Sequence, residues 1–363
     1  MKKIVSFMMI LVLCAGIAGC GLSNNISGTK TTDTSAQNAA KQHEQDRKSY
    51  KEVLRVYNAA EYIDESTIVD FEKEYKIRVE YAEFESNETL YNDVSGNLGA
   101  YDVLVPSDYM VDRLIKEGKL AKIDRANVPN IANVAAEYLA PAYDAGNEYT
   151  VPYMVGTVGL LYNKKKVSAP IESWSALFDA QYKGKVLLWD SQRDVIGATL
   201  KLLGYSMNSS KDSELSAAQT KLSAARASVQ YGGEEMRDKM IAGEGVVALV
   251  YSGEAKSAID QNPNLAYSIP KEGSNKWVDG FVVMKNSTAK AAAEKFINFM
   301  CRPNIAVRNM TQTGYTSPIK GAWAEFGNNQ VMFPTAEELA RCEAFLYDAS
   351  AAQKYNSLWA KVK

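Results

Sequence analysis

Strand-like and helix-like segments alternate along the chain from residue 53 onward, and this alternation constrains the fold more than any other feature. Residues 53–58 (VLRVYN) form a short apolar run that ends in a polar turn, as a strand does. Residues 66–75 place Ile68, Phe71 and Tyr75 on one helical face. The segments that follow repeat this order as strand 77–82, helix 88–96, strand 101–105 and a helix that starts at Ser107 or Asp108 and runs to 117. Such a rhythm predicts a parallel or mixed sheet covered by helices.

A second set of alternating segments follows a long extended run at 151–162. Its expected elements are helix 174–178, strand 185–189, helix 195–203, strand 245–251, an extended run at 277–284 and helix 289–301. This order predicts two α/β domains whose chain crosses between them more than once. Ligands of such folds bind in the cleft between the domains.

The N-terminus carries the pattern of an export signal. Lys2 and Lys3 precede an apolar stretch at 4–17 that is too short to span a bilayer comfortably. The residues at the end of the expected signal, IAGC at 17–20, resemble the lipobox of bacterial lipoproteins. This resemblance implies cleavage before Cys20 and lipidation of its thiol. An ordinary secretory signal with a chance cysteine is the alternative.

We therefore expect a signal peptide at 1–19 and a lipidated Cys20 followed by a flexible tether as far as residue 51. The segment 20–51 is rich in Ser, Thr, Asn, Gln and Lys and cannot bury enough apolar surface to offset its ordering entropy. The body that follows is expected to work outside the cytoplasm, anchored to the membrane by its lipid.

Composition and residue usage exclude several classes of function. The formal net charge of −2 argues against a nucleic-acid partner, which needs a clustered basic face. The single histidine, His43, lies in the expected tether, so the body has none for a zinc site or a Ser-His-Asp triad. There is no P-loop or dinucleotide-binding glycine motif. We expect no enzyme, no cofactor and no metal. Cys301 and Cys342 fit either one disulfide or two buried free thiols.

Several blocks of the sequence resemble the bacterial spermidine/putrescine-binding proteins, in the family's order and over nearly the whole body. These blocks are VYNAAEYID (56–64), FEKEYKIRVEYAEFESNETLY (71–91), YDVLVPSDYMVDRLIKEGKLAKID (101–124), YTVPYMVGTVGLLYN (149–163), YKGKVLLWDSQRDVIG (182–197), KLLGYS (201–206), WVDGFVV (277–283), FINFMCRPNIA (296–306) and TGYTSP (313–318). The resemblance implies a type II-like periplasmic-binding-protein fold: two α/β lobes, each a mixed sheet flanked by helices, with the ligand in the inter-lobe cleft. It also implies capture of a polyamine, spermidine or putrescine, and its delivery to the permease subunits of an ABC importer.

We expect lobe 1 to comprise 52–155 with 279–324, lobe 2 to comprise 156–278 with 325–363, and the protein to be a monomer. Two other functions stay open. One is a same-fold solute-binding protein for another cationic small molecule, such as a thiamine-like compound. The other is an extracellular hydrolase that uses two carboxylates.

A polyamine is a flexible chain of methylenes with separated ammonium groups, so its site needs carboxylates at ammonium spacing and aromatic faces beside the chain. Trp277 and Asp279 alternate on one strand and share a face, which suits an ammonium group better than a core. The residues and the resemblance together suggest these ligand-binding residues: Glu61, Tyr62, Ser107, Tyr109, Asp190, Ser191, Asp194, Tyr251, Trp277, Asp279 and Tyr315.

Ordinary structural roles compete with some of these assignments. Glu61 also suits the first turn of the following helix, Trp277 suits a core, and Asp194 suits an ion pair at a helix start. We expect Glu85 and Arg193 to be structural.

The sequence also departs from the family pattern. Ala59 and Ala60 stand where the family commonly has a Trp and then Thr or Gly, so one aromatic wall is missing. Ser191 stands at a family carboxylate, and Asp190 either turns inward to replace it or the site has one charge fewer. Tyr251 stands where some members have Trp, and a polar family ligand aligns near Leu346. These departures leave the choice among spermidine, putrescine and another amine open.

Overall fold

The computed structural model describes residues 34–363, so the expected signal peptide and Cys20 lie outside the described residues. Its helices are α1 (Thr34–Arg47), α2 (Glu65–Tyr75), α3 (Asn87–Ser95), α4 (Asp108–Lys116), α5 (Gln192–Leu202), α6 (Asp212–Ala225), α7 (Glu235–Ile241), α8 (Ser252–Gln261), α9 (Lys290–Met300), α10 (Pro303–Thr313), α11 (Ala336–Ala340) and α12 (Ala349–Val362). Its strands are β1 (Glu52–Ala59), β2 (Ile77–Phe84), β3 (Val103–Leu104), β4 (Leu120–Ala121), β5 (Thr150–Asn163), β6 (Val186–Trp189), β7 (Val229–Gly232), β8 (Val247–Tyr251), β9 (Leu265–Ser268) and β10 (Lys276–Met284). The helix expected at 174–178 is a 3-10 helix, Trp174–Phe178.

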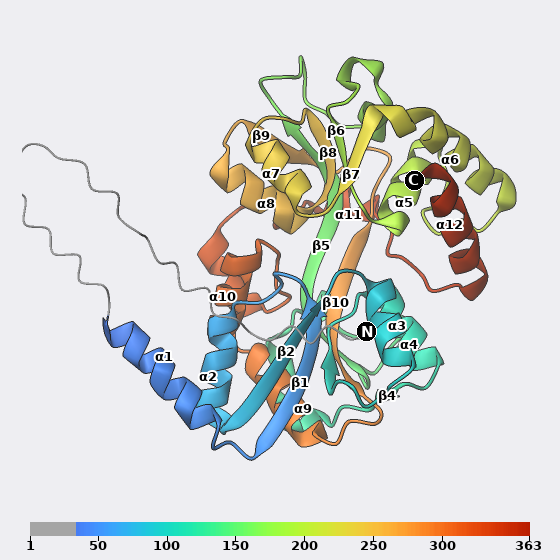
Figure 1. Ribbon diagram of the computed structural model, residues 1–363. Coiled ribbons are helices and arrows are strands. Elements are labelled where there is room, and N and C mark those ends of the chain that lie inside the picture. Colours follow the sequence, from blue (N-terminus) through green and yellow to red (C-terminus); the bar gives the residue numbers. More distant parts are fainter. Residues whose placement is uncertain (1–33) are drawn as a thin grey trace, which may run out of the picture. The chain divides into compact units, whose positions relative to one another are not determined.

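One mixed sheet connects two halves of the molecule through β5 and β10 (Figure 1). Its strand order is β2-β1-β3-β10-β5-β8-β6-β7, with β4 paired to β10 and β9 paired to β5. The strands β2, β1 and β3 are parallel, as are β7, β6 and β8, whereas β10 and β5 run antiparallel to their neighbours. The alternation of strands and helices in the sequence therefore produces the mixed sheet that it predicts.

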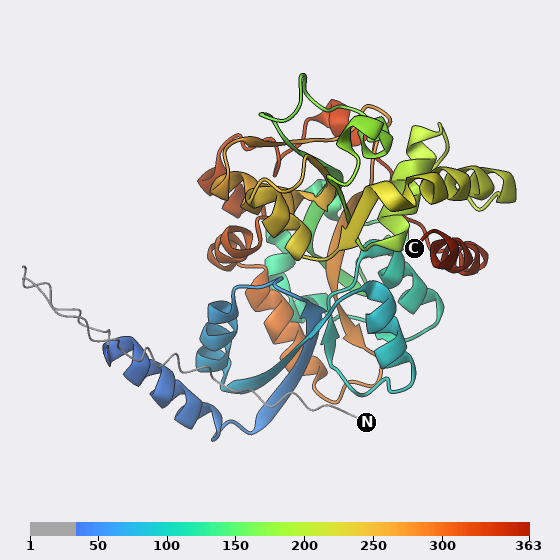
Figure 2. The ribbon, with the colours of Figure 1, turned by 45° about the horizontal axis from the view of Figure 1, so that its top comes forward.

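We call the part built on β1–β4 and β10 the first lobe and the part built on β6–β9 the second lobe. Helix α2 shows why these segments fold where they do: Asp64 caps its N-terminus by accepting from the Ser66 N–H, and Phe71 is fully buried against the sheet. In the second lobe, α12 packs beside α5 and α6 (Figure 2), which places the C-terminal helix there.

Strand β5 belongs to both lobes. Its residues as far as Thr157 pair with β10, and those from Val158 onward pair with β8 and β9. The register between β5 and β10 shifts between Asp279 and Gly280, which marks a bulge where the lobes meet. The lobe boundary expected after residue 155 falls within β5; the exact boundaries stay a prediction.

The residues just before β1 differ from the flexible tether that the sequence predicts. Helix α1 (TSAQNAAKQHEQDR) contains no glycine or proline and is rich in good helix formers, which explains why it is helical. From His43 onward the chain belongs to the compact unit 43–363. His43 Nε2 lies 2.7 Å from Glu72 Oε2, and Arg47 Nη2 donates to Glu72 Oε1 at 3.0 Å. His43 is thus buried against α2 instead of lying in a tether.

Two further findings concern the cysteines and the length of the helices. Cys301 and Cys342 are both buried free thiols, so they form no disulfide with each other. Among residues 34–363, no helix is long and apolar enough to cross a bilayer.

Candidate functional site

An aromatic cluster lies where β10 meets the ends of strands from both lobes. The Tyr315 ring meets Tyr62 and Trp277 edge-on, with ring centroids 5.3 Å apart in each pair. Tyr251, at the end of β8, meets Trp277 edge-on at 6.5 Å. Tyr62, Trp277 and Tyr315 are buried. Four residues that the sequence predicts for the site are thus brought together from four separate segments.

Two glycines make this packing possible. A Cβ atom at Gly156 of β5 would lie 2.4 Å from the Trp277 ring, and one at Gly253 of α8 would lie 2.6 Å from the Tyr315 ring. Real side chains do not approach this closely, so the two rings lie directly on glycine backbone. The two glycines therefore permit the observed positions of Trp277 and Tyr315, which a side chain at either site would exclude.

Asp279 is the carboxylate of this cluster, and only one of its oxygens is satisfied. Its Oδ2 accepts a 2.9 Å hydrogen bond from the Tyr62 hydroxyl, whereas no described residue donates to Oδ1 in hydrogen-bonding geometry. Burial raises the pKa of Asp279 to about 6, and the hydroxyls of Ser107 and Tyr62 beside it limit that rise. A buried carboxylate with an open oxygen can accept an N–H donor from a ligand.

Ser107 is held in place by Asn87 of α3. The Asn87 side chain donates to Ser107 Oγ and accepts from the Ser107 N–H, each at 3.0 Å. An isolated antiparallel bridge then pairs Ser107 with Asp279. Asn87 thus sets the position of a predicted site residue, although no sequence pattern singles it out.

Asp194 provides a second buried carboxylate, from the first turn of α5 in the second lobe. Its Oδ2 accepts from the hydroxyls of Ser191, at 2.6 Å, and Tyr251, at 2.9 Å. Its Oδ1 accepts from Asn275 Nδ2 at 3.1 Å. Burial raises the pKa of Asp194, while these donors lower it. Three predicted residues, Ser191, Asp194 and Tyr251, therefore form one network, and Asn275 is a member that the sequence did not reveal.

Glu61 and Asp190 lie apart from the buried cluster. Glu61 is exposed, adopts a left-handed backbone conformation with φ of 53°, and lies 3.5 Å from Arg237 Nη1 of the second lobe. Asp190 is exposed and forms an ion pair with Lys363. The inward turn of Asp190 that the sequence allows therefore does not occur, because the C-terminal Lys363 holds its carboxylate at the surface.

Tyr109 lies between the two lobes, at the edge of the cluster. Its hydroxyl donates to Glu88 at 3.0 Å, and its ring meets Phe345 edge-on at 6.3 Å. The Arg193 guanidinium lies 5.2 Å from the Tyr109 ring centroid and 4.6 Å from that of Phe345. Arg193 thus packs against rings from both lobes, and its structural role stays a prediction.

Asp108 is a buried acid whose sequence position predicts only a helix start. It follows Ser107 at the first position of α4 and is 5% exposed. Burial, helped by the charge of Asp279, raises its pKa to about 8. Ser107, Asp108 and Tyr109, which follow β3 after Val105 and Pro106, are a sequence signal for a polar site. An acid at that place is, however, also the usual pattern of a helix N-terminus.

The described residues contain no cluster of three or more His, Cys, Asp or Glu side chains arranged to hold a metal ion. The site is instead built from separated carboxylates, hydroxyls and aromatic rings. This combination suits an organic cation.

The geometry can be compared with known proteins. A family model described as bacterial extracellular solute-binding protein matches residues 66–334. The protein belongs to this family.

Its relatives give the same result over most of the chain. It is 32% identical to the spermidine/putrescine-binding periplasmic protein of Escherichia coli (strain K12), over 85% of this chain and 91% of that protein. The structure of the spermidine/putrescine ABC transporter substrate-binding protein PotD from Streptococcus pneumoniae matches with a TM-score of 0.74 at 32% identity, over 86% of this chain and 98% of that one. The structure of the TpPotD lipoprotein of Treponema pallidum matches with a TM-score of 0.76 at 27% identity, over 86% and 99%. The family resemblance and the two-lobe periplasmic-binding-protein fold that the sequence implies are confirmed.

The lobes of this solute-binding protein touch on both sides of the central cluster. On one side Glu61 of the first lobe lies beside Arg237 of the second. On the other side Tyr109 contacts Phe345, and Arg113 of α4 lies 5.2 Å from the Tyr347 ring centroid. These contacts connect the two lobes on either side of the buried carboxylates.

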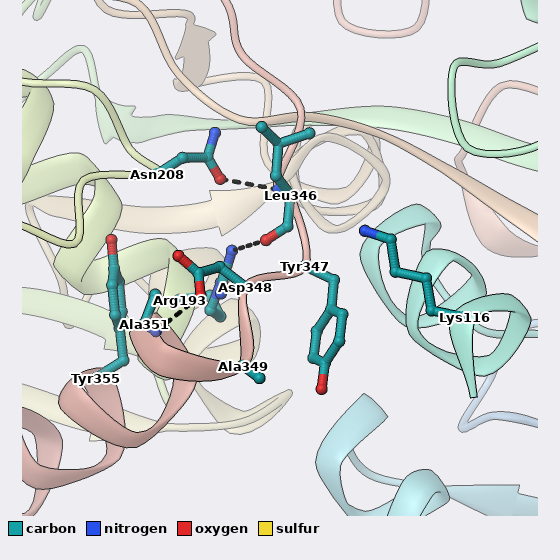
Figure 3. Close-up of a pocket in the computed structure, with 9 residues that line it drawn as sticks. All are labelled: Lys116, Arg193, Asn208, Leu346, Tyr347, Asp348, Ala349, Ala351 and Tyr355. Carbon is teal, nitrogen blue, oxygen red and sulfur yellow. Dashed lines mark hydrogen bonds between the residues drawn. The ribbon is translucent and has the colours of Figure 1, made fainter.

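A cavity of about 480 Å³ lies outside the cluster, beside the start of α12 (Figure 3). It is lined by Lys116, Arg193, Asn208, Leu346, Tyr347, Asp348, Ala349, Ala351 and Tyr355. Arg193 Nη2 donates to the Leu346 carbonyl at 3.1 Å, and the Leu346 N–H donates to Asn208 Oδ1 at 2.8 Å. Two cationic side chains and a single acid line this cavity, so its charge does not suit a polycation. Leu346, near which the sequence resemblance places a polar ligand residue, is 63% exposed and has no polar side chain.

Proposed function

We propose that this solute-binding protein captures a polyamine, spermidine or putrescine, outside the cytoplasm and delivers it to the permease subunits of an ABC importer. The observation that carries the proposal is Asp279, a buried carboxylate with one unpaired oxygen, which accepts from the Tyr62 hydroxyl and shares a strand face with Trp277. The names of the E. coli and S. pneumoniae relatives support the same ligand class and the same transport role.

The chemistry of the cluster suits a chain with charged nitrogens and an apolar stem. A charge-assisted hydrogen bond from an ammonium group to a carboxylate contributes about 1.5–3 kcal/mol. An aromatic face beside an ammonium group adds about 0.5–2 kcal/mol. Asp279 belongs to the first lobe, and the network of Asp194 and Tyr251 belongs to the second. Because Tyr251 meets Trp277 edge-on, a ligand at Asp279 can contact side chains of both lobes at once. The contacts between the lobes, Glu61 with Arg237 and Tyr109 with Phe345, would then shield the ligand from water. This shielding strengthens the electrostatic interactions.

Several parts of the proposal concern the whole protein. We infer that Cys20 carries a lipid that anchors the protein at the membrane, which the T. pallidum lipoprotein relative supports. We infer that the protein acts as a monomer and that it catalyses no reaction on its ligand.

The residues at the end of β1 bear on which polyamine is bound. Ala59 and Ala60 supply no aromatic face, and the carboxylate of the following Glu61 forms an ion pair with Arg237. A site with one wall fewer has less contact to offer the longer spermidine, so putrescine should lose less affinity through this change.

A thermal-shift panel tests the proposal with the signal-free protein from residue 34 onward. Putrescine and spermidine should raise the melting temperature, because a ligand at 100 times its Kd stabilises by about 2.7 kcal/mol. Thiamine and ferric citrate serve as the matched non-polyamine ligands. A shift by thiamine alone would replace the polyamine with another cation, and turnover of any of these compounds would contradict the binding role.

Closure of the lobes provides a second test. Two lobes joined by β5 and β10 should close on the ligand as rigid bodies around the bulge at Asp279. Small-angle scattering should show a smaller radius of gyration with saturating putrescine than without it. An unchanged radius, with binding confirmed separately, would contradict closure as the signal that the importer reads.

A further inference from the structure

A second buried carboxylate lies next to Asp279 where α4 begins. The bridge between Ser107 and Asp279 brings the following residue, Asp108, to β10. Asp108 is 5% exposed and Asp279 is 9% exposed. Asp108 Oδ2 lies 3.4 Å from the backbone N of Val278, the residue that precedes Asp279, and the charge of Asp279 helps to raise the pKa of Asp108. The first lobe therefore places two carboxylates in one buried position.

The contacts of Asp108 leave its charge uncompensated. Its Oδ1 accepts from the Tyr109 N–H at 2.7 Å, and its Oδ2 accepts from the Val278 N–H at 3.4 Å, which is long for a hydrogen bond. Within residues 34–363, no lysine or arginine forms an ion pair with Asp108 or Asp279. Arg193 acts on Asp108 from a distance, but its Nη2 donates to the Leu346 carbonyl.

The other titratable groups around the two carboxylates supply no positive charge. Tyr109 and Tyr143 lie near Asp108, and the groups near Asp279 are Tyr62, Tyr143, Tyr153, Tyr251 and Tyr315. Burial raises the pKa of each of these tyrosines, so they are neutral. Asp112 and Asp144 also act on Tyr143, and Asp112 is paired with Lys116.

Helix capping does not account for Asp108. An acid in the first turn of a helix gains about 0.3–1 kcal/mol from the helix dipole. Burying an unpaired carboxylate costs several kcal/mol even after relaxation, which is more than the dipole returns. The burial of Asp108 beside an equally unpaired Asp279 therefore requires either a bound proton or a bound cation.

We propose that Asp108 and Asp279 form one ammonium site, in which Asp108 is a specificity-determining residue that selects a primary ammonium group. This inference rests on the proposed polyamine function and identifies the part of the site that binds the terminal ammonium group of the polyamine. A primary ammonium group has three N–H donors. Asp279 Oδ1 accepts from no described residue, and each Asp108 oxygen accepts one backbone N–H and has a further lone pair for a ligand donor. A quaternary ammonium ion has no N–H and would leave both carboxylates without hydrogen bonds.

A proton is displaced when this site fills. With pKa values of about 8 for Asp108 and about 6 for Asp279, the ligand-free pair holds one proton near neutral pH. An ammonium group favours ionisation of both carboxylates, so binding transfers the proton of Asp108 to the buffer. Affinity should therefore rise between about pH 6 and pH 8. Putrescine is the suitable probe, because primary amines stay protonated throughout this range.

Calorimetry with putrescine tests the inference. Titrations near pH 7 in two buffers of different ionisation enthalpy should show proton release by the wild type. Asp108→Asn should abolish that release and weaken putrescine binding by about tenfold at pH 8. Asp112→Asn is the matched control, since it removes an acid one turn along the same helix, and it should change neither quantity.

The outcomes separate this inference from the proposed function. Absence of binding by the wild type to putrescine and spermidine would refute the polyamine function itself. Normal binding by the wild type, with no proton release and an unchanged Asp108→Asn, would overturn the role of Asp108 and leave the function standing. If Asp108→Asn does not fold, the wild-type proton count decides alone. Choline binding as tightly as putrescine would overturn the selection of a primary ammonium group.

Discussion

The two lobes carry buried carboxylates in opposite states of satisfaction. Asp194 of the second lobe accepts three hydrogen bonds, from Ser191, Tyr251 and Asn275. Asp279 of the first lobe accepts one, from Tyr62; the Ser107 hydroxyl lies beside it, and no described residue donates to its Oδ1 in hydrogen-bonding geometry. A satisfied carboxylate orders the side chains around it, whereas an open one is available to a ligand. The difference indicates that the side chains around Asp194 in the second lobe are ordered before ligand binds, and that Asp279 in the first lobe makes the stronger interaction with the ligand.

Asp279→Asn should have the largest effect on binding, because it removes the charge that faces the ligand. We expect putrescine and spermidine affinity to fall at least about tenfold, as expected for loss of a charge-assisted hydrogen bond of about 1.5–3 kcal/mol. Calorimetry on the folded variant measures this. Unchanged affinity would remove Asp279 from the site and reverse the comparison between the lobes.

Asp194→Ala should chiefly lower stability. It leaves the Ser191 and Tyr251 hydroxyls and the Asn275 amide without their acceptor, at a cost of about 1–3 kcal/mol in the free energy of unfolding. Urea denaturation of the ligand-free protein checks this, with Asp279→Ala as the matched variant in the other lobe. A larger loss of stability in Asp279→Ala than in Asp194→Ala would contradict the contrast drawn here.

Ala59→Trp should strengthen the first lobe further. A new indole at the end of β1 would restore the missing wall and tighten spermidine binding by about 0.5–2 kcal/mol. Titrations with spermidine and putrescine, each on wild type and variant, provide the comparison. Weaker binding of both would show that the loop after β1 has been rebuilt around the small side chain.

Glu61→Gln should have the smallest effect. Its ion pair with Arg237 is at the surface, and such pairs contribute about 0.2–1 kcal/mol. Arg237→Gln also removes the 3.0 Å ion pair with Glu254, so its loss should be the larger of the two, and the double variant should lose no more affinity than Arg237→Gln alone. If Glu61→Gln weakened binding as much as Asp279→Asn, Glu61 would be a direct ligand residue instead of a contact between the lobes.

Much of the architecture could be predicted from the sequence, because it is encoded locally. The apolar periodicity of 53–58 and 66–75 placed β1 and α2, and the alternation of Trp277 with Asp279 placed both in one cluster. The polar composition of α1 predicts a flexible segment, yet the helix forms because Ala, Gln, Lys and Glu are also good helix formers.

The rest of the site depends on contacts that sequence patterns do not record. Asp190 is held by Lys363, a residue at the other end of the second lobe in sequence. Glu61 meets Arg237 across the two lobes. Asp108 looks like any acid at a helix start until its burial beside Asp279 is known. In each case the partner lies far along the chain, so only the folded structure shows the role.

The packing of Trp277 also gives the protein an optical property. Trp277 is one of five tryptophans, and its indole Nε1 has no hydrogen-bond partner among the described residues. Tyr251 from the second lobe and Tyr315 near the first lobe both meet its ring edge-on. The surroundings of the indole therefore depend on the positions of both lobes. An ammonium group arriving at Asp279, two residues along the same strand face, would change the electric field on that indole. The intrinsic fluorescence of the unlabelled protein should therefore report ligand binding directly, and Trp277→Phe should remove most of that signal.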